Sequence, residues 1–237
     1  MRDAHKRRNI SKIPSNVESA SFYGCSFLTS LLYNRWVLFL DVDEFLVLKK
    51  TKNVVDLAQE YAKDGAVAIS SQVFGTNGLE TYDTRPVVFR FQCIVANHER
   101  NGLVKSLVKL DDVSSFDAFD NPYVFPTKKG KFTLDTKGIA VKDPKHFGPM
   151  DVAVVNKYYY QSKEEFVEKV AKTDLLTGEE PDDATVETAQ DGKDPETGKP
   201  IPEGSIHDDT AWKVLKEGDP FYIKYASKSA DVSTCKG

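Results

Sequence analysis

An apolar run that ends in three carboxylates is the feature that most constrains this chain. Residues 35–50 read RWVLFLDVDEFLVLKK, and Asp41, Asp43 and Glu44 follow directly on the apolar residues. We predict a strand over 36–41. A run of this kind is typical of a strand buried on both faces at the centre of a mainly parallel sheet. Clustered carboxylates repel one another and are costly to bury, so their charge must be compensated.

Two oxygen ligands on one short turn suit a hard divalent cation. Asp41 and Asp43 can face one side of the chain while Val42 faces the other. Mg²⁺ or Mn²⁺ would then complete its shell with water and phosphate oxygens. The alternative is a strand end with solvated acids. Glu44 is expected to matter less than Asp43, because Phe45 indicates that the chain is already turning back into the core.

The order of apolar patterns predicts an α/β protein with a β-rich second half. Before residue 73 we expect helix 16–33, the strand 36–41, helix 53–63 capped by Asn53, and strand 66–72. Strand-like segments separated by turn residues follow at 86–95, 103–109, 131–135, 138–142 and 152–160. A further helix is predicted from Ser162, because Glu165 three residues later completes a capping box.

Composition divides the chain into three parts. Residues 1–176 are predicted to form the main domain. Residues 177–206 are acidic, rich in proline and glycine, and almost free of large apolar side chains, so a flexible insertion or linker is expected. Residues 207–237 regain a short helix around Trp212 and are expected to pack on the main domain.

Charge, hydropathy and cysteine content exclude several classes of protein. The net charge of −4 is small and mixed, which argues against a general nucleic-acid binder. No apolar run approaches the roughly 20 residues needed to span a membrane. Cys25, Cys93 and Cys235 are far apart and odd in number, which argues against a disulfide framework and favours a reducing compartment.

The string WVLFLDVDEFL resembles the metal-binding segment of GT-A-type glycosyltransferases, most closely the group related to families 2 and 92 that carries W-x4-D-x-D-E-F. Three further segments resemble that group in the same order: SSQVFGTNG at 70–78, VKSLVK at 104–109 and NKYYYQSKEEFVEK at 156–169. The likeness covers roughly residues 20–172. It implies a GT-A-like, Rossmann-like mixed sheet flanked by helices.

The resemblance also implies a set of site residues. Asp43 would bind the metal directly, and Asp41 would contact the metal through water or the nucleotide ribose. Gly75 and Gly78 allow close backbone approach, and Asn77 offers both a donor and an acceptor. The expected substrate-binding residues are Phe74, Gly75, Asn77, Gly78 and Lys105.

The implied reaction is transfer of a sugar from a nucleoside diphosphate to a hydroxyl of a glycan or glycoprotein, with Mn²⁺ or Mg²⁺ as cofactor and inversion favoured. The metal would neutralise the departing diphosphate. An inverting enzyme also needs a carboxylate base. Asp111 and Asp112, which follow the apolar residues 107–110, are candidates, and a turn of solvated acids is the alternative.

The sequence departs from the family pattern at several places, among them Gln161 where the group has a lysine and Tyr123 where it tends to have a histidine. Lys157 stands where the group has a histidine that could join the metal site. The part before Asp41 is short, which suggests an N-terminally truncated domain. The location would be cytoplasmic by default, or Golgi or membrane-associated if an N-terminal segment is missing.

Two other functions remain open at this point. One is a non-catalytic sugar- or nucleotide-binding relative, which the short front part and Lys157 favour. The other is a phosphatase of the haloacid dehalogenase type, which also places D-x-D after an apolar strand. The phosphatase pattern needs a small residue where this chain has Phe45.

Overall fold

A computed structural model gives the fold of the second of two compact units. The chain divides into Met1–Asn34 and Arg35–Gly237, and every described residue belongs to the latter. The described residues are 36–115, 123–172, 180–218 and 235. The helix expected over 16–33 lies outside them.

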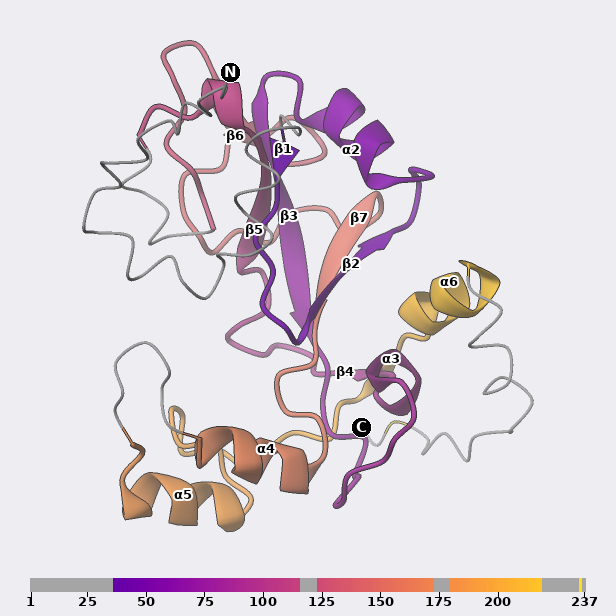
Figure 1. Cartoon of the computed structure of the whole chain (residues 1–237), viewed down its shortest axis with the longest axis vertical. Coiled ribbons are helices and arrows are strands. Elements are labelled where there is room, and N and C mark those ends of the chain that lie inside the picture. The colour runs from indigo at the N-terminus through magenta and orange to yellow at the C-terminus, as the bar shows by residue number, and fades with distance from the viewer. Residues whose placement is uncertain (1–35, 116–122, 173–179, 219–234, 236–237) are drawn as a thin grey trace, which may run out of the picture. The chain divides into compact units, whose positions relative to one another are not determined.

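A mixed six-stranded sheet forms the centre of the described part of the chain (Figure 1). Its order is β1-β5-β3-β7-β2, and β6 pairs with β3 off this path. Both β6 and β7 run parallel to β3, whereas the other neighbouring pairs are antiparallel. The prediction of a mixed α/β fold is thereby confirmed. The strands are β1 (Trp36–Val37), β2 (Glu44–Leu48), β3 (Gly65–Val73), β5 (Val104–Lys109), β6 (Phe132–Leu134) and β7 (Ala153–Lys157).

The central strand β3 is buried along its whole length. Val67 and Ile69 contact Leu57 and Ala58 of helix α2 (Val54–Tyr61) in one apolar cluster. The side chain of Asn53 caps this helix and accepts a hydrogen bond from the backbone of Asp56 at 2.9 Å. The sequence predicted a strand over 66–72 and a helix over 53–63 capped by Asn53, and both predictions are confirmed.

The prediction of a long central strand over 36–41 is wrong. Strand β1 covers only Trp36–Val37, lies at the edge of the sheet and pairs antiparallel with β5. Leu38 and Leu40 are half-buried against the α2 cluster, and Phe39 packs against the ring of Phe125 at 5.8 Å. The apolar residues 38–40 are therefore half-buried by side chains that pack beside the sheet. They do not lie between two neighbouring strands.

Two other strand predictions are wrong. Residues 86–95 form the short helix α3 (Val87–Arg90) and the two-residue strand β4 (Cys93–Ile94), which pairs with β8 (Ile206–His207). The helical turn buries Val88 and Phe89 against Trp212, so tertiary packing overrides the strand propensity of the segment. Residues 138–142 contribute only an isolated bridge from Ala140 to β6. The strands expected within 103–109, 131–135 and 152–160 are present as β5, β6 and β7.

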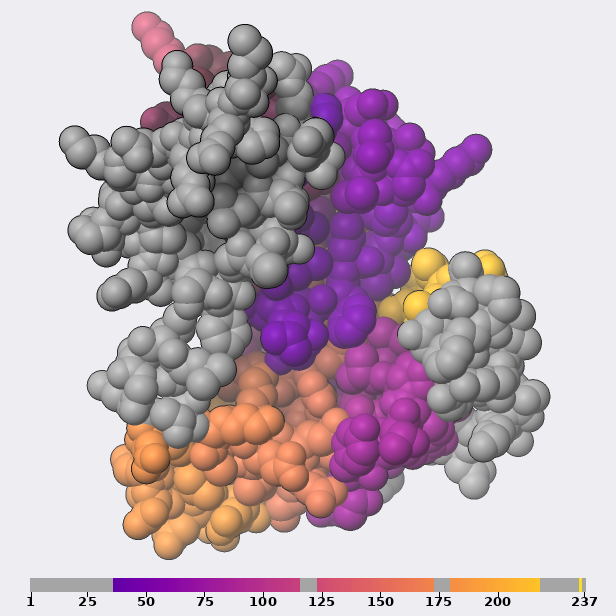
Figure 2. Space-filling model, in the orientation of Figure 1, coloured from indigo at the N-terminus to yellow at the C-terminus, as the bar shows by residue number. Residues whose placement is uncertain are grey.

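The segment expected to be flexible holds a packed helix. Helix α5 covers Asp183–Gln190. Asp182 caps its N-terminus, and the Asp182 side chain accepts a hydrogen bond from the backbone N–H of Thr185 at 2.7 Å. Its Ala189 is fully buried against Tyr160 and against Phe166 of α4 (Lys163–Val170). Helices α4 and α5 form one continuous orange block in Figure 2. This acidic helix can pack with Ala189 as its one buried residue, because α4 supplies the apolar surface that Ala189 contacts.

The described residues of helix α6 pack on the rest of the unit. Helix α6 (Thr210–Gly218) places the ring of Trp212 at 4.9 Å from that of Phe89. Of the helices that the structure describes, none combines the length and the apolarity that crossing a membrane requires.

Candidate functional site

The acidic turn, which we define as Asp41–Glu44, connects the apolar run to β2. It is closed by two hydrogen bonds: the backbone N–H of Glu44 donates to the carbonyl of Asp41 at 3.0 Å, and the backbone N–H of Asp41 donates to Glu44 Oε2 at 3.0 Å. Val42 at the tip is 89 % exposed. The third carboxylate of the sequence pattern therefore shapes the turn that presents the other two.

Glu44 is the buried anchor of the acidic turn. Its side chain is 1 % exposed, and its Oε2 lies 2.9 Å from Lys105 Nζ on β5. Its Oε1 lies 2.6 Å from Lys157 Nζ on β7, as an ion pair without the alignment of a hydrogen bond. Lys157 is also the residue directly opposite Glu44 across the β2–β7 pair. The turn is thus tied to two strands of the sheet.

Asp41 and Asp43 lie nearer to solvent and make weaker pairs. Asp41 Oδ2 is 3.1 Å from Lys105 Nζ, and half of the Asp41 side chain is exposed. Asp43 Oδ2 is 2.6 Å from Nζ of Lys169, an exposed lysine on α4. Three lysines therefore face three carboxylates, and they supply the charge compensation that the sequence alone left open.

The pairing also shifts the pKa values of two groups, Asp41 and Lys105. Burial alone would raise the pKa of Asp41, but the charge and hydrogen bond of Lys105 outweigh burial and lower the pKa below its ordinary 3.8. Burial alone would lower the pKa of Lys105, but the charges of Glu44 and Asp41 raise the pKa above its ordinary 10.5. Each group is thus held more firmly in its charged form than in the unfolded chain.

These shifts predict how the Asp41–Lys105 pair responds to pH. A lowered carboxyl pKa stabilises the fold above 3.8 and loses that effect as pH falls through the folded value. A raised lysine pKa stabilises below 10.5 and loses that effect as pH rises through the folded value. Urea unfolding of the natural protein and of Asp41→Asn should show a difference in stability near pH 6 that shrinks towards about pH 2.5. An unchanged difference would contradict the pairing.

Asp41 and Asp43 are the two carboxylates of the acidic turn that could hold a divalent cation together with phosphate. Within the described ranges, no group of three or more His, Cys, Asp or Glu side chains is arranged to hold a metal ion. Mg²⁺ commonly uses only one or two carboxylates and takes its remaining ligands from water and substrate phosphates. Solvent-exposed ion pairs contribute only about 0 to 1 kcal/mol, so a cation could displace Lys169 from Asp43 at small cost.

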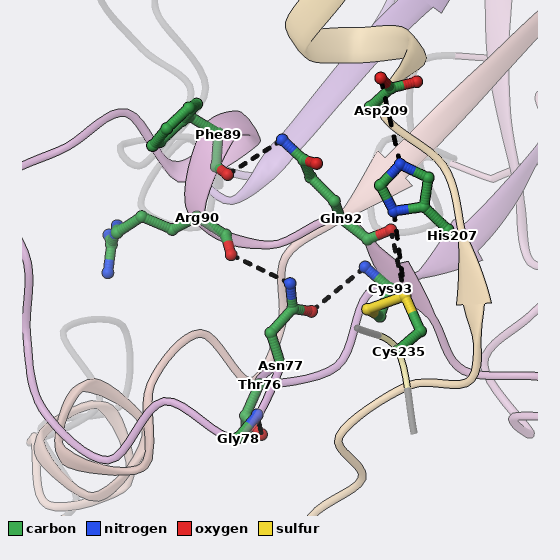
Figure 3. Close-up of a disulfide and its surroundings, with 10 residues drawn as sticks. All are labelled: Thr76, Asn77, Gly78, Phe89, Arg90, Gln92, Cys93, His207, Asp209 and Cys235. Atoms are coloured by element: carbon green, nitrogen blue, oxygen red, sulfur yellow. Dashed lines mark hydrogen bonds and ion pairs between the residues drawn. A yellow bond between two sulfur atoms is a disulfide. The ribbon is translucent and has the colours of Figure 1, made fainter. Parts of the chain in front are cut away.

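The loop expected to shape a sugar pocket makes mostly internal contacts. Phe74 is buried, and its ring stacks on that of Tyr158 at 4.8 Å. Asn77, at a positive φ of 53°, donates from Nδ2 to the carbonyl of Arg90 and accepts the backbone N–H of Cys93, both at 3.1 Å (Figure 3). Through Asn77, the loop is therefore hydrogen-bonded to the end of α3 and to the start of β4.

The two glycines of this loop lie against one neighbouring segment. A Cβ on Gly75 would lie 2.4 Å from the backbone carbonyl carbon of Glu203, so this close approach requires glycine. Gly78 is exposed and lies beside the Glu203 carboxylate. Of the expected substrate-binding residues, Lys105 alone is brought to the acidic turn.

The structure does not bring the two candidate bases to the acidic turn. Asp111 and Asp112 lie in a short 3-10 helix, Leu110–Asp112, at the far end of β5 from Lys105. The extended strand runs on from Lys105 to Lys109, which is four residue steps or about 13 Å at roughly 3.3 Å per residue, before the 3-10 helix begins. Asp112 is buried 3.5 Å from Lys131 Nζ, and the carbonyl of Asp111 accepts from Lys128.

An aromatic side chain that sequence reasoning missed borders the acidic turn. The ring of Tyr159 has Lys169 Nζ at 4.0 Å and the guanidinium of Arg100 at 4.2 Å from its centroid. Arg100 also forms an ion pair with Glu196. The run of three tyrosines at 158–160 was the available signal, but the pattern does not show which ring faces the charged groups.

The cysteine content argued against a disulfide framework, but two of the three cysteines form one disulfide. Cys93 on β4 and Cys235 form a disulfide with their Cα atoms 5.5 Å apart (Figure 3). His207 of the neighbouring strand β8 lies beside it, with Nδ1 4.0 Å from the sulfur of Cys235. A separation of 142 residues hides this pairing in the sequence. Because two cysteines are paired, the cysteine content no longer favours a reducing compartment.

Comparisons with known proteins add no further identification. No family model matches the chain, and neither the curated proteins nor the solved structures that were searched contain a match to it.

Proposed function

We propose that this chain is a glycosyltransferase with a GT-A-like domain, which moves a sugar from a nucleoside-diphosphate donor to an acceptor hydroxyl. The observation that carries the proposal is the division of roles in the acidic turn. Glu44 is buried and paired with two lysines, whereas the side chains of Asp41, 50 % exposed, and Asp43, 16 % exposed, lie nearer to solvent. A purely structural turn would not need two further acids at its exposed side.

The residues of the chain have separable roles in this proposal. Asp41 and Asp43 would hold Mn²⁺ or Mg²⁺ together with the donor diphosphate. The bound cation would stabilise negative charge on the leaving diphosphate. Lys169, which is exposed and bound to Asp43, can turn towards a phosphate when the cation takes its place. Glu44 and Lys105 hold the turn in position from behind.

We expect Mn²⁺ and a nucleoside diphosphate to stabilise the protein together much more than either does alone. The acidic turn is already neutralised by lysines, so a free cation meets ammonium groups and a free diphosphate meets carboxylates. Only the complex of both adds little net charge. Thermal unfolding with Mn²⁺, with UDP or GDP, and with both would measure this linkage.

Two variants sharpen this experiment. Asp43→Asn should abolish the joint stabilisation, and without ligands it should cost at most about 1 kcal/mol, because only an exposed pair with Lys169 is lost. Asp183→Asn, at an exposed carboxylate on α5, should keep the full response. Equal responses of both variants would show that the cation binds elsewhere.

A non-catalytic relative is the second candidate, and one observation favours it. Lys157, at the position where the likeness places a histidine, forms an ion pair with Glu44 and completes the neutralisation of the turn. If Mn²⁺ and nucleotide together produce no stabilisation while a sugar still binds, this candidate replaces the transferase. Cleavage of an aryl phosphate would instead favour the phosphatase.

A further inference from the structure

A cavity of about 520 Å³ lies at the carboxyl end of the central strand β3, outside the acidic turn. It is lined by the segment that follows β4, by the loop that precedes β7, and by Gln72 of β3. Ligands of open α/β sheets bind at the carboxyl ends of strands, and cavities of roughly 300 to 1,000 Å³ suit small ligands. The cavity is therefore a candidate binding site that the proposed donor site does not use.

An exposed aromatic ring lines this cavity in a fixed position. Phe147 is 68 % exposed, which is unusual for a phenylalanine that the fold holds in place. Its ring lies against Gly102, where a Cβ would come within 2.7 Å of a ring carbon. Gly102 also has a positive φ of 78°, so its backbone favours glycine. The ring thus packs on the backbone at Gly102 and has Lys145 Nζ at 5.8 Å from its centroid, while 68 % of Phe147 stays exposed.

Hydrogen bonds fix the backbone on both sides of that ring. The backbone N–H of His146 donates to the carbonyl of Gly102 at 2.8 Å, and that of Gly148 donates to Ser70 Oγ at 3.0 Å. Across the cavity, Asn101 accepts from the backbone of Val73 and donates to the carbonyl of Val95, both at 2.8 Å. The backbone that lines the cavity is therefore held in place without a ligand, which lowers the conformational entropy lost on binding.

A buried amide offers one acceptor to the cavity. Gln72 is 7 % exposed, and its Nε2 donates to Asn156 Oδ1 at 2.9 Å and to Asp208 Oδ2 at 3.0 Å. The carboxylate can only accept, which fixes the orientation of the amide. Among the described residues, Gln72 Oε1 has no hydrogen-bond donor. Its carbonyl is therefore available to a hydroxyl group of a ligand.

A chain of side-chain contacts connects the cavity to the acidic turn. His98 lines the cavity, and its Nδ1 accepts the backbone N–H of Arg100 at 3.1 Å. The Arg100 guanidinium lies over the ring of Tyr159. The Lys169 ammonium also lies over this ring and forms an ion pair with Asp43. A ligand in the cavity would therefore lie outside the proposed donor site but be linked to it through Arg100 and Tyr159.

We propose that this cavity binds a neutral carbohydrate and is the acceptor site of the transferase. An open aromatic ring suits the apolar face of a sugar, and the Gln72 carbonyl suits a sugar hydroxyl. Both signs of charge, on Glu99 and Lys145, line the cavity, which favours a ligand without net charge. The assignment as acceptor site rests on the proposed function, whereas carbohydrate binding itself does not.

Carbohydrate binding can be tested without donor or metal. The full chain is titrated with cellotetraose, maltotetraose, chitotetraose and N-acetyllactosamine, and saturation-transfer NMR reports contact. At least one of the four should bind, and Phe147→Ala should weaken its binding by up to about tenfold, the size of one aromatic contact. The matched control is Phe132→Ala, at an exposed phenylalanine of β6 that does not line the cavity, and it should bind as the natural protein does.

The outcomes separate this inference from the proposed function. Phe147→Ala should keep the joint response to Mn²⁺ and nucleotide, which Asp43→Asn should lose while still binding the sugar. Binding of none of the four sugars, or equal binding by Phe147→Ala, would overturn the inference and leave the donor site standing. Preferential binding of uridine or guanosine over all four sugars would also overturn it, because the ring would then hold a base.

Discussion

Replacing Glu44 by glutamine is expected to lower the free energy of unfolding by about 3 to 5 kcal/mol, the usual cost of breaking a buried ion pair. The Glu44 side chain is 1 % exposed and lies 2.9 Å from Lys105 Nζ and 2.6 Å from Lys157 Nζ. Glutamine keeps the shape of the side chain but removes its charge. Two nearly buried ammonium groups then lose a shared counter-ion. Urea unfolding near pH 7 measures the loss.

Two comparisons make this result specific. Glu168→Gln, at an exposed glutamate of α4, should change stability by no more than about 0.5 kcal/mol. The double variant Glu44→Gln, Lys157→Met should lose less than the sum of the two single losses, because removing both partners leaves less uncompensated charge. If Glu44→Gln costs less than about 1 kcal/mol, the lysines do not hold the acidic turn.

This expectation reverses the order of importance that the sequence indicated. In the sequence, Glu44 is the last of three adjacent acids and precedes an apolar residue, so Asp43 looked more important. The structure places Glu44 opposite Lys157 in the β2–β7 pair and beside Lys105 of β5. Strand register decides which acid is buried, and register depends on strands far apart in the chain.

The parts of the fold that sequence predicted are those with local causes. Helix α2 follows from the cap at Asn53 and its apolar spacing, and α4 follows from the reciprocal bonds of Ser162 and Glu165. Strand β3 follows from its own apolar residues, among them Val67 and Ile69. In each case the residues that determine the element lie within it or directly beside it.

The parts that sequence did not predict depend on distant partners. Helix α5 is stabilised because Ala189 packs on Phe166 of α4 and because the nearby buried Asp194 accepts from Tyr160 at 2.8 Å. The composition of 177–206 gave no sign of these partners. The same holds for the cavity, where Phe147 lies on Gly102 from another part of the chain. Motif spacing could locate the acidic turn, but not its lysines or the ring next to it.

Breaking the Cys93–Cys235 disulfide is expected to destabilise the protein by about 2 to 5 kcal/mol. A bond that joins residues 142 positions apart restricts the unfolded chain strongly, and chain entropy alone gives about 5 kcal/mol for a loop of this length. The native state also loses the attachment of Cys235 to β4, where Cys93 is fully buried and its carbonyl accepts from the backbone of Gly75 at 2.9 Å.

Thiol counting and thermal unfolding test this disulfide together. Denatured, unreduced protein should show one reactive thiol, because three cysteines less the two in the disulfide leave Cys25. Cys235→Ser should lower the melting temperature by about 4 to 20 °C, at roughly 2 to 4 °C per kcal/mol for a chain of this size. Cys25→Ser, the matched control, should keep a reductant-sensitive melting temperature. Three reactive thiols before reduction, or a melting temperature insensitive to reductant, would contradict the pairing.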